Sequence, residues 1–137
     1  NGKFTLTRGT YDPGDVIEVT ARAASGITAK ATIYVVEETN RVVIAQSLNE
    51  GTPVEYDRRT TTLGLGNTCA LMSLVETKSN RNHWIEAGEE NTAPVTYTAN
   101  KKDTVQIVGN KVTRLKSGKV TITARTSDGK SYKLTLN

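Results

Sequence analysis

Apolar side chains occupy every second position in residues 119–125 and again in residues 131–136. A period of two is typical of a β-strand that buries one face. The two stretches are separated by Asp128-Gly129, a pair that tolerates the positive φ angles of a tight hairpin turn. The pattern therefore predicts a β-hairpin whose inward residues are Val120, Ile122, Ala124, Tyr132, Leu134 and Leu136.

The same pattern occurs a second time near the start of the chain. Apolar residues alternate in 17–22 and 29–35 around Ser25-Gly26, and superposing Ala21 on Ala124 keeps the inward positions in phase at an offset of 103 residues. That offset is the size of one β-sandwich domain. We predict a complete domain over 39–137, preceded in residues 1–38 by the C-terminal strands of a like repeat. A segment this short cannot bury a core alone, so it either packs its apolar face on the complete domain or stands as a mobile hairpin.

Between the two hairpins the pattern remains that of strands. No amphipathic helix longer than about two turns is predicted, and the ambiguous stretch 71–78 is assigned to a strand. The chain is therefore expected to be an all-β sandwich of two sheets. The intervening strands are predicted at 41–45, 60–65, 68–75, 95–98 and 104–108.

Composition adds limits to this picture. The mass of 14.8 kDa is enough for one domain with a core, and large aromatics are few, with one Trp, one Phe and five Tyr. No stretch approaches the length of apolar sequence that a membrane helix needs, so no membrane insertion is expected. The single cysteine, Cys69, excludes an internal disulfide. The abrupt start NGKFTLT is more typical of a fragment than of a natural N-terminus.

About 70 residues resemble the bacterial Ig-like domain, group 2. The closest similarity is at 115–124, where Leu115, Gly118, Ile122 and Ala124 fit the pattern Leu-x-x-Gly-x-x-x-Ile-x-Ala. Residues 66–71, 95–98 and 105–112 are similar to other strands of that family, although Tyr97 stands where the family usually has Trp. Its hydroxyl needs a hydrogen-bond partner or access to water. The stretches 49–59 and 77–91 depart from the family pattern.

The resemblance implies an Ig-like two-sheet β-sandwich in a non-catalytic structural or adhesion module of a bacterial cell-surface or secreted protein. Such a module acts as a spacer repeat or contacts a host protein or glycan, and its other partners are neighbouring repeats of the same chain. The alternative is an accessory domain of a phage virion protein that contacts host surface carbohydrate. A third class, a binding module appended to an enzyme, is also open.

The sequence offers little for catalysis, for cofactors or for metals. Cys69 falls in a strand pattern whereas His83 falls in a polar loop, and no motif supplies a third catalytic residue. Adjacent glutamates at 37–38 and 89–90 face opposite ways in a strand and so do not form a catalytic pair. Asp12, Asp15 and 89–90 offer oxygen ligands for calcium but lack EF-hand spacing, and the aspartates are also ordinary turn residues.

The stretch 77–91 is predicted to be an inserted loop, and it holds the only tryptophan. Arg81, Asn82, His83 and Trp84 form a candidate contact surface for a glycan or a protein, because aromatic and arginine side chains dominate contact energies. The competing interpretation is that Trp84 and Ile85 fold back and cap one end of the sandwich. A chain with so few large aromatics favours this second interpretation.

Charge is distributed unevenly. Residues 1–100 contain nine Lys/Arg and twelve Asp/Glu, whereas residues 101–137 contain nine Lys/Arg and two Asp, a net charge of +7. Lys119, Arg125 and Lys133 are all predicted to point outward and to share one face. This basic face either meets an anionic wall polymer or membrane surface, or only keeps the sheet solvated. It has no aromatic residues interleaved with the charges, so nucleic acid is not an expected partner.

Overall fold

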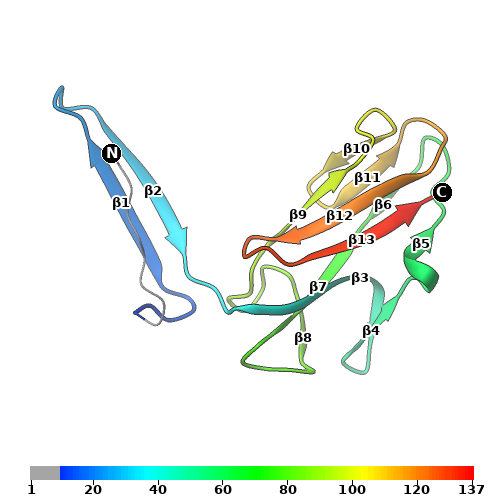
Figure 1. Cartoon of the computed structure of the whole chain (residues 1–137), viewed down its shortest axis with the longest axis horizontal. Helices are drawn as coiled ribbons and strands as arrows, with labels where there is room; N and C mark the ends of the chain where they lie inside the picture. The colour runs from blue at the N-terminus through cyan, green and yellow to red at the C-terminus, as the bar shows by residue number, and fades with distance from the viewer. Residues whose placement is uncertain (1–9) are drawn as a thin grey trace.

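A computed structural model describes residues 10–137, which are built almost entirely from β-strands (Figure 1). The only helical element among these residues is a short 3₁₀ turn, η1 (Asp57–Arg59). The early strands are β1 (Val16–Arg22), β2 (Thr28–Tyr34), β3 (Thr39–Asn49), β4 (Thr52–Glu55), β5 (Thr60–Thr61), β6 (Thr68–Ala70) and β7 (Met72–Thr77). The later strands are β8 (Trp84–Glu86), β9 (Val95–Ala99), β10 (Val105–Val108), β11 (Lys111–Arg114), β12 (Val120–Thr126) and β13 (Ser131–Leu136).

The strands from β3 onward form an all-β sandwich. One layer is the sheet β5-β13-β12-β9, and β12 and β13 pack against β3 in the sheet β4-β3-β7-β8. A smaller sheet, β10-β11-β6, continues that second layer, because β6 and β7 are separated by a single residue. No helix among residues 10–137 is long and apolar enough to cross a membrane.

The core of the sandwich confirms the alternation that the sequence predicted in the C-terminal hairpin. Six inward residues of β12 and β13 are at most 3% exposed, and Val120 pairs with Leu136 in the register that places them on the same face. Small and β-branched residues from the opposite layer complete the core, as expected from the scarcity of aromatics. These partners include Val42, Ile44, Leu74, Val75, Val105 and Val112.

Several segments differ from the sequence-based expectation, among them β4 and β11, which lie where no strand was predicted. The strand predicted over 68–75 divides at Leu71, whose N–H donates to the Asn110 carbonyl and whose carbonyl accepts from the Asn110 amide, so the chain passes there from one sheet to another. The strand predicted over 60–65 is limited to β5, which pairs in parallel with β13. The loop expected over 77–91 contains the edge strand β8. Periodicity could not reveal these features, because each depends on which strand lies alongside.

The N-terminal hairpin, β1 and β2, forms a sheet of its own. Its register repeats that of β12 and β13 at an offset of 103 residues: Ile17 pairs with Ile33 as Val120 pairs with Leu136. Burial differs completely between the two copies. Ala29 and Ala31 are exposed, and Ile17, Val19 and Ile33 are only half-buried. The apolar face of the hairpin is therefore not packed on the sandwich, and Figure 1 shows the hairpin standing away from it. Residues 1–9 of the predicted partial repeat lie outside the described residues.

The chain passes into the sandwich at Thr39 and leaves it after β13, and Figure 1 shows these two points at opposite ends of the sandwich. Between hairpin and sandwich, the Glu37 N–H donates to the Asn91 carbonyl at 2.8 Å. Gly14 also lies against Asn91, and an added Cβ at this glycine would meet the Asn91 amide nitrogen at 3.1 Å. The connection is thus a short segment held by the loop before β9.

Candidate functional site

Three side chains form a row across neighbouring strands of the sheet β4-β3-β7-β8. Arg41 on β3 is opposite Glu76 on β7, and Glu76 is opposite Trp84 on β8. Directly opposite residues of antiparallel strands project from the same face of a sheet. The strand pairing therefore brings together residues that are 35 and 8 positions apart in the sequence.

Glu76 is the anchor of this row. Its carboxylate is 1% exposed and accepts hydrogen bonds from the Arg41 guanidinium at 2.9 and 3.0 Å. It also accepts from the Asn40 amide at 2.6 Å and from the Asn82 N–H at 2.7 Å. The Arg41 hydrogen bonds are the main cause that lowers the pKa of Glu76 to about 2, against the opposing effect of burial. Glu76 is therefore ionised at neutral pH and fixes both Arg41 and the turn before β8.

A groove with a polar lining lies beside Trp84. Its volume is about 270 Å³. The Arg41 guanidinium lies over the Trp84 ring, 4.9 Å from the ring centroid, and its pKa is raised mainly by the hydrogen bonds to Glu76. We name this depression the Trp84 groove; its lining residues are Arg41, Val43, Gly51, Thr52, Pro53, Glu55, Asn82 and Trp84.

The predicted contact residues do not all reach this groove. Asn82 and Trp84 line it, whereas His83 lines a different cavity of about 240 Å³ beside Ile85. Arg81 is exposed and lines neither cavity. Asn82 lies in the turn before β8, with a φ of 64°, whereas His83 leads directly into β8, where successive side chains project to opposite sides. Trp84 is half-buried and also packs against the core, so it combines the two roles that the sequence left as alternatives.

Sequence reasoning missed the half of the groove that comes from β3 and β4. Arg41, Val43 and Glu55 line it beside Trp84, but no motif links them to the contact loop. The one available signal was the position of Arg41 at the start of an apolar run, where a charged residue is usually unremarkable. The pairing of β3 with β7 had to be known before Arg41 could be placed beside Trp84.

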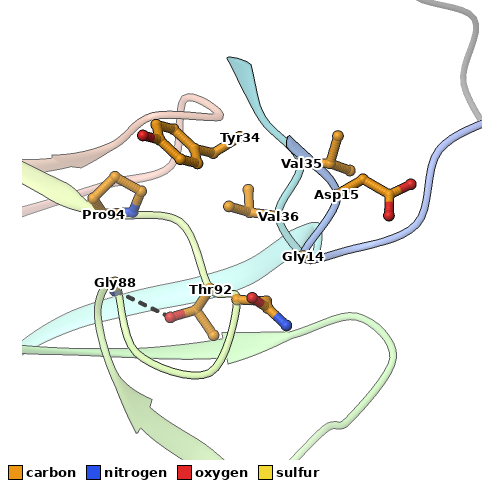
Figure 2. Close-up of a pocket in the computed structure, with 9 residues that line it drawn as sticks. Gly14, Asp15, Tyr34, Val35, Val36, Gly88, Thr92 and Pro94 are labelled. Carbon is orange, nitrogen blue, oxygen red and sulfur yellow. Dashed lines mark hydrogen bonds between the residues drawn. The ribbon is translucent and has the colours of Figure 1, made fainter. Parts of the chain in front are cut away.

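A second cavity lies at the junction of hairpin and sandwich (Figure 2). Its volume is about 250 Å³, and Tyr34, Val36 and Pro94 contribute an apolar lining. The only hydrogen bond drawn within it is from the Gly88 N–H to the Thr92 hydroxyl, at 3.1 Å. The cavity is formed mainly by connecting segments and has few side chains that could orient a ligand.

The remaining candidates for chemistry are explained by local structure. Burial raises the pKa of the Cys69 thiol, which is the opposite of the activation that a nucleophilic cysteine needs. The Asp15 carboxylate accepts from the Asp12 N–H at 2.8 Å and so caps its own turn. No group of three or more metal-ligating side chains is found among residues 10–137.

The predicted basic residues lie where the pattern places them. Arg125 on β12 and Lys133 on β13 are exposed, and the register puts Thr123 opposite Lys133 and Ser131 opposite Arg125. Lys119 is exposed and precedes β12 in the same phase. All three therefore belong to the outer face of the sheet β5-β13-β12-β9.

No protein-family model matches the chain, and no curated protein matches it.

Proposed function

We propose that this chain is a non-catalytic structural and adhesion module of a bacterial cell-surface or secreted protein. In this proposal it is an Ig-like repeat, of the group 2 bacterial kind that its sequence resembles. Its residues 39–137 form one repeat, and its hairpin belongs to the preceding one. It spaces a distal region from the cell and offers the Trp84 groove to a host glycan or protein.

The observation that carries the proposal is the repeated hairpin register. β1 and β2 pair as β12 and β13 do, but their inward residues lack the opposing layers that cover Val120 and Leu134. A two-stranded hairpin is at best marginally stable in water. A preceding copy of the sandwich would supply the missing cover. The chain enters and leaves the sandwich at opposite ends, which suits repeats that follow one another in a line (Figure 1).

A concatemer tests the spacer role. Residues 35–137, one period of 103 residues, are appended once, twice and three times after Asn137. Small-angle scattering should show a maximum dimension that grows by an equal increment with each added copy. The control carries a Gly/Ser linker between copies, for which the dimension should approach the square-root growth of a flexible chain. Square-root growth in both series would rule out a stiff spacer.

The contact role rests on the composition of the Trp84 groove. An indole ring stacks on the apolar face of a sugar, while Arg41, Glu55 and Asn82 offer hydrogen-bonding groups of both kinds at its rim. Peptides also use aromatic and arginine contacts, so both ligand classes belong in the test.

Binding to a glycan array and to whole host cells is measured for the chain and for Trp84→Ala. The matched control is Tyr34→Ala, which removes an aromatic side chain that is 70% exposed on the hairpin. Binding should fall at least ten-fold only in Trp84→Ala, and a bound ligand should shield Trp84 of the unaltered chain from acrylamide quenching. Binding that survives Trp84→Ala would place the contact elsewhere. No binding at all would leave the spacer role alone.

A further inference from the structure

The outer face of the sheet β5-β13-β12-β9 contains cations and hydroxyls but no carboxylate. None of its four strands includes Asp or Glu. We call this surface the Thr/Arg/Lys face. Its outward residues are Thr96, Thr98, Thr121, Thr123, Arg125, Ser131, Lys133 and Thr135, with Lys119 at one end.

The cations of this face have no ion-pair partner in the part of the chain that the structure describes. Among residues 10–137, neither Arg125 nor Lys133 nor Lys119 forms an ion pair. The two aspartates nearest in sequence are engaged elsewhere. Asp103 pairs with Lys116, and the Asp128 carboxylate accepts from the Thr39 N–H and the Thr126 hydroxyl. The positive potential of the face is therefore not cancelled from within.

Hydroxyls lie in rows between the charges. Thr98, Thr123 and Lys133 are successive neighbours across three strands, and Thr96, Arg125 and Ser131 form the next row. Directly opposite side chains are separated by about 5 Å and diagonal ones, such as Arg125 and Lys133, by about 7–8 Å. None of these hydroxyls is hydrogen-bonded to another part of the described chain. The face thus presents free donors at regular intervals on a rigid support.

The two copies of the hairpin preserve this outer face more than the inner one. At the offset of 103 residues, four of seven outward positions are identical: Thr20 and Thr123, Arg22 and Arg125, Lys30 and Lys133, Thr32 and Thr135. The three that differ are Val16 and Lys119, Glu18 and Thr121, and Thr28 and Ser131. Of the six inward positions, only Ala21 and Ala124 are identical. Solvation alone does not require particular residues at outward positions, whereas packing constrains inward ones. In these two hairpins the outward positions are nevertheless more alike than the inward ones, which supports a ligand-directed constraint on the outer face.

We propose that the Thr/Arg/Lys face binds a linear anionic polymer whose phosphate or sulfate groups recur along its length. Ionised oxygens accept hydrogen bonds from arginine, lysine and threonine, and charge-assisted bonds of this kind are the stronger ones. A polymer lies across several rows of the sheet and so contacts cations that are too far apart for one small anion. Bases of a nucleic acid would find no stacking partner here, because Tyr97 and Tyr132 point into the sandwich.

Binding of fluorescent heparin and of inorganic polyphosphate to the full chain tests the proposal. The measurement is fluorescence anisotropy at roughly 20 mM salt, where screening is weak. Arg125→Gln with Lys133→Gln should weaken binding at least ten-fold. The matched control, Lys102→Gln with Lys111→Gln, removes the same charge from exposed positions outside this sheet and should change the affinity less than two-fold. Thermal unfolding of both variants verifies that the fold is intact.

Two further readouts distinguish a built surface from net charge. Thr123→Val removes a hydroxyl from the middle row without changing charge, and should weaken binding about three-fold, as expected for the loss of one hydrogen bond of modest net strength. The logarithm of the affinity should fall with the logarithm of salt with a slope of about −2 to −3, as three contacting cations release counterions.

The comparison of the two probes identifies the source of the anion. A higher affinity for heparin would indicate that the ligand is a sulfated polysaccharide, and a higher affinity for polyphosphate would indicate a phosphate polymer. Equal affinities would indicate that the face recognises the oxyanion that both polymers share. An equal loss in the face variant and the control variant would overturn the proposal, as would the absence of binding to both probes. These results are independent of whether the Trp84 groove binds a ligand.

Discussion

The buried carboxylate of Glu76 gives the most direct test of how the sandwich is held together. Replacing it in Glu76→Gln keeps the shape of the side chain but removes its charge. The two Arg41 donors, the Asn40 amide and the Asn82 N–H then meet a neutral group that offers one acceptor instead of two. The variant should therefore be less stable at neutral pH.

The size of the loss follows from the pKa of Glu76, which is lowered from 4.5 to about 2. This difference corresponds to roughly 3 kcal/mol of preference for the ionised form in the folded protein. Arg41 is 57% exposed, so water screens part of the interaction, and we expect a loss of about 2 kcal/mol. Because the folded pKa lies below the unfolded one, this stability is present above a pH of about 4.5 and disappears as the pH falls toward 2.

Urea unfolding followed by circular dichroism measures the effect at neutral pH and at about pH 2. The difference between the unaltered chain and Glu76→Gln should be about 2 kcal/mol at neutral pH and close to zero at the acid pH. Glu86→Gln is the matched control, since it makes the same change at an exposed position on β8, and it should alter stability by less than about 0.5 kcal/mol. A difference between the chain and Glu76→Gln that is the same at both pH values would refute the reasoning.

Three other tests, each built on a substitution, probe the fold. Ala124→Leu should destabilise the sandwich by about 1–3 kcal/mol, because Ala124 is 0% exposed in a filled core. Ala21→Leu makes the same change at the equivalent exposed position of β1 and should leave the urea midpoint unchanged. Equal effects of the two substitutions would mean that the hairpin is covered. Tyr97→Phe removes the hydroxyl that is hydrogen-bonded to Ser73 and should lower the free energy of unfolding, measured in urea, by about 1 kcal/mol. Adding Ser73→Ala should lower it little further if the two hydroxyls are partners only of each other. Gly118→Ala should lower the free energy of unfolding by about 1–2 kcal/mol, seen as a lower melting temperature. The cause is backbone strain, because Gly118 has a φ of +115°, and not a clash, because an added Cβ would meet nothing within 4 Å. An unchanged melting temperature would show that the turn before β12 relaxes freely.

The sequence was sufficient for elements whose structure depends on near neighbours. Alternation located β12 and β13, and Asp128-Gly129 marked their turn, because a hairpin brings together residues that are also close in the chain. The repeat at an offset of 103 residues was also visible, since both copies keep the same phase. The partner expected for the Tyr97 hydroxyl exists in Ser73.

The parts that could not be predicted depend on contacts between distant strands. Leu71 looks like the middle of one strand, and only the approach of Asn110 shows that the chain changes sheets there. Glu76 interrupts an apolar pattern and would ordinarily be assigned to solvent. Its burial follows from Arg41, which lies 35 residues earlier. For the same reason the Trp84 groove was only half predicted.

The position of β13 has a consequence for a protein under tension. β13 lies between β12 and β5, antiparallel to one and parallel to the other, and it runs toward the end where the chain leaves the sandwich (Figure 1). A pull on that end acts along the strand, so the hydrogen bonds on both sides are loaded in shear and must yield together. β1 and β2 are joined at one tip, and a pull on their free ends peels their pairs apart one by one. A stretched chain should therefore lengthen first by opening this hairpin at low force, while the sandwich holds until a much higher force is reached.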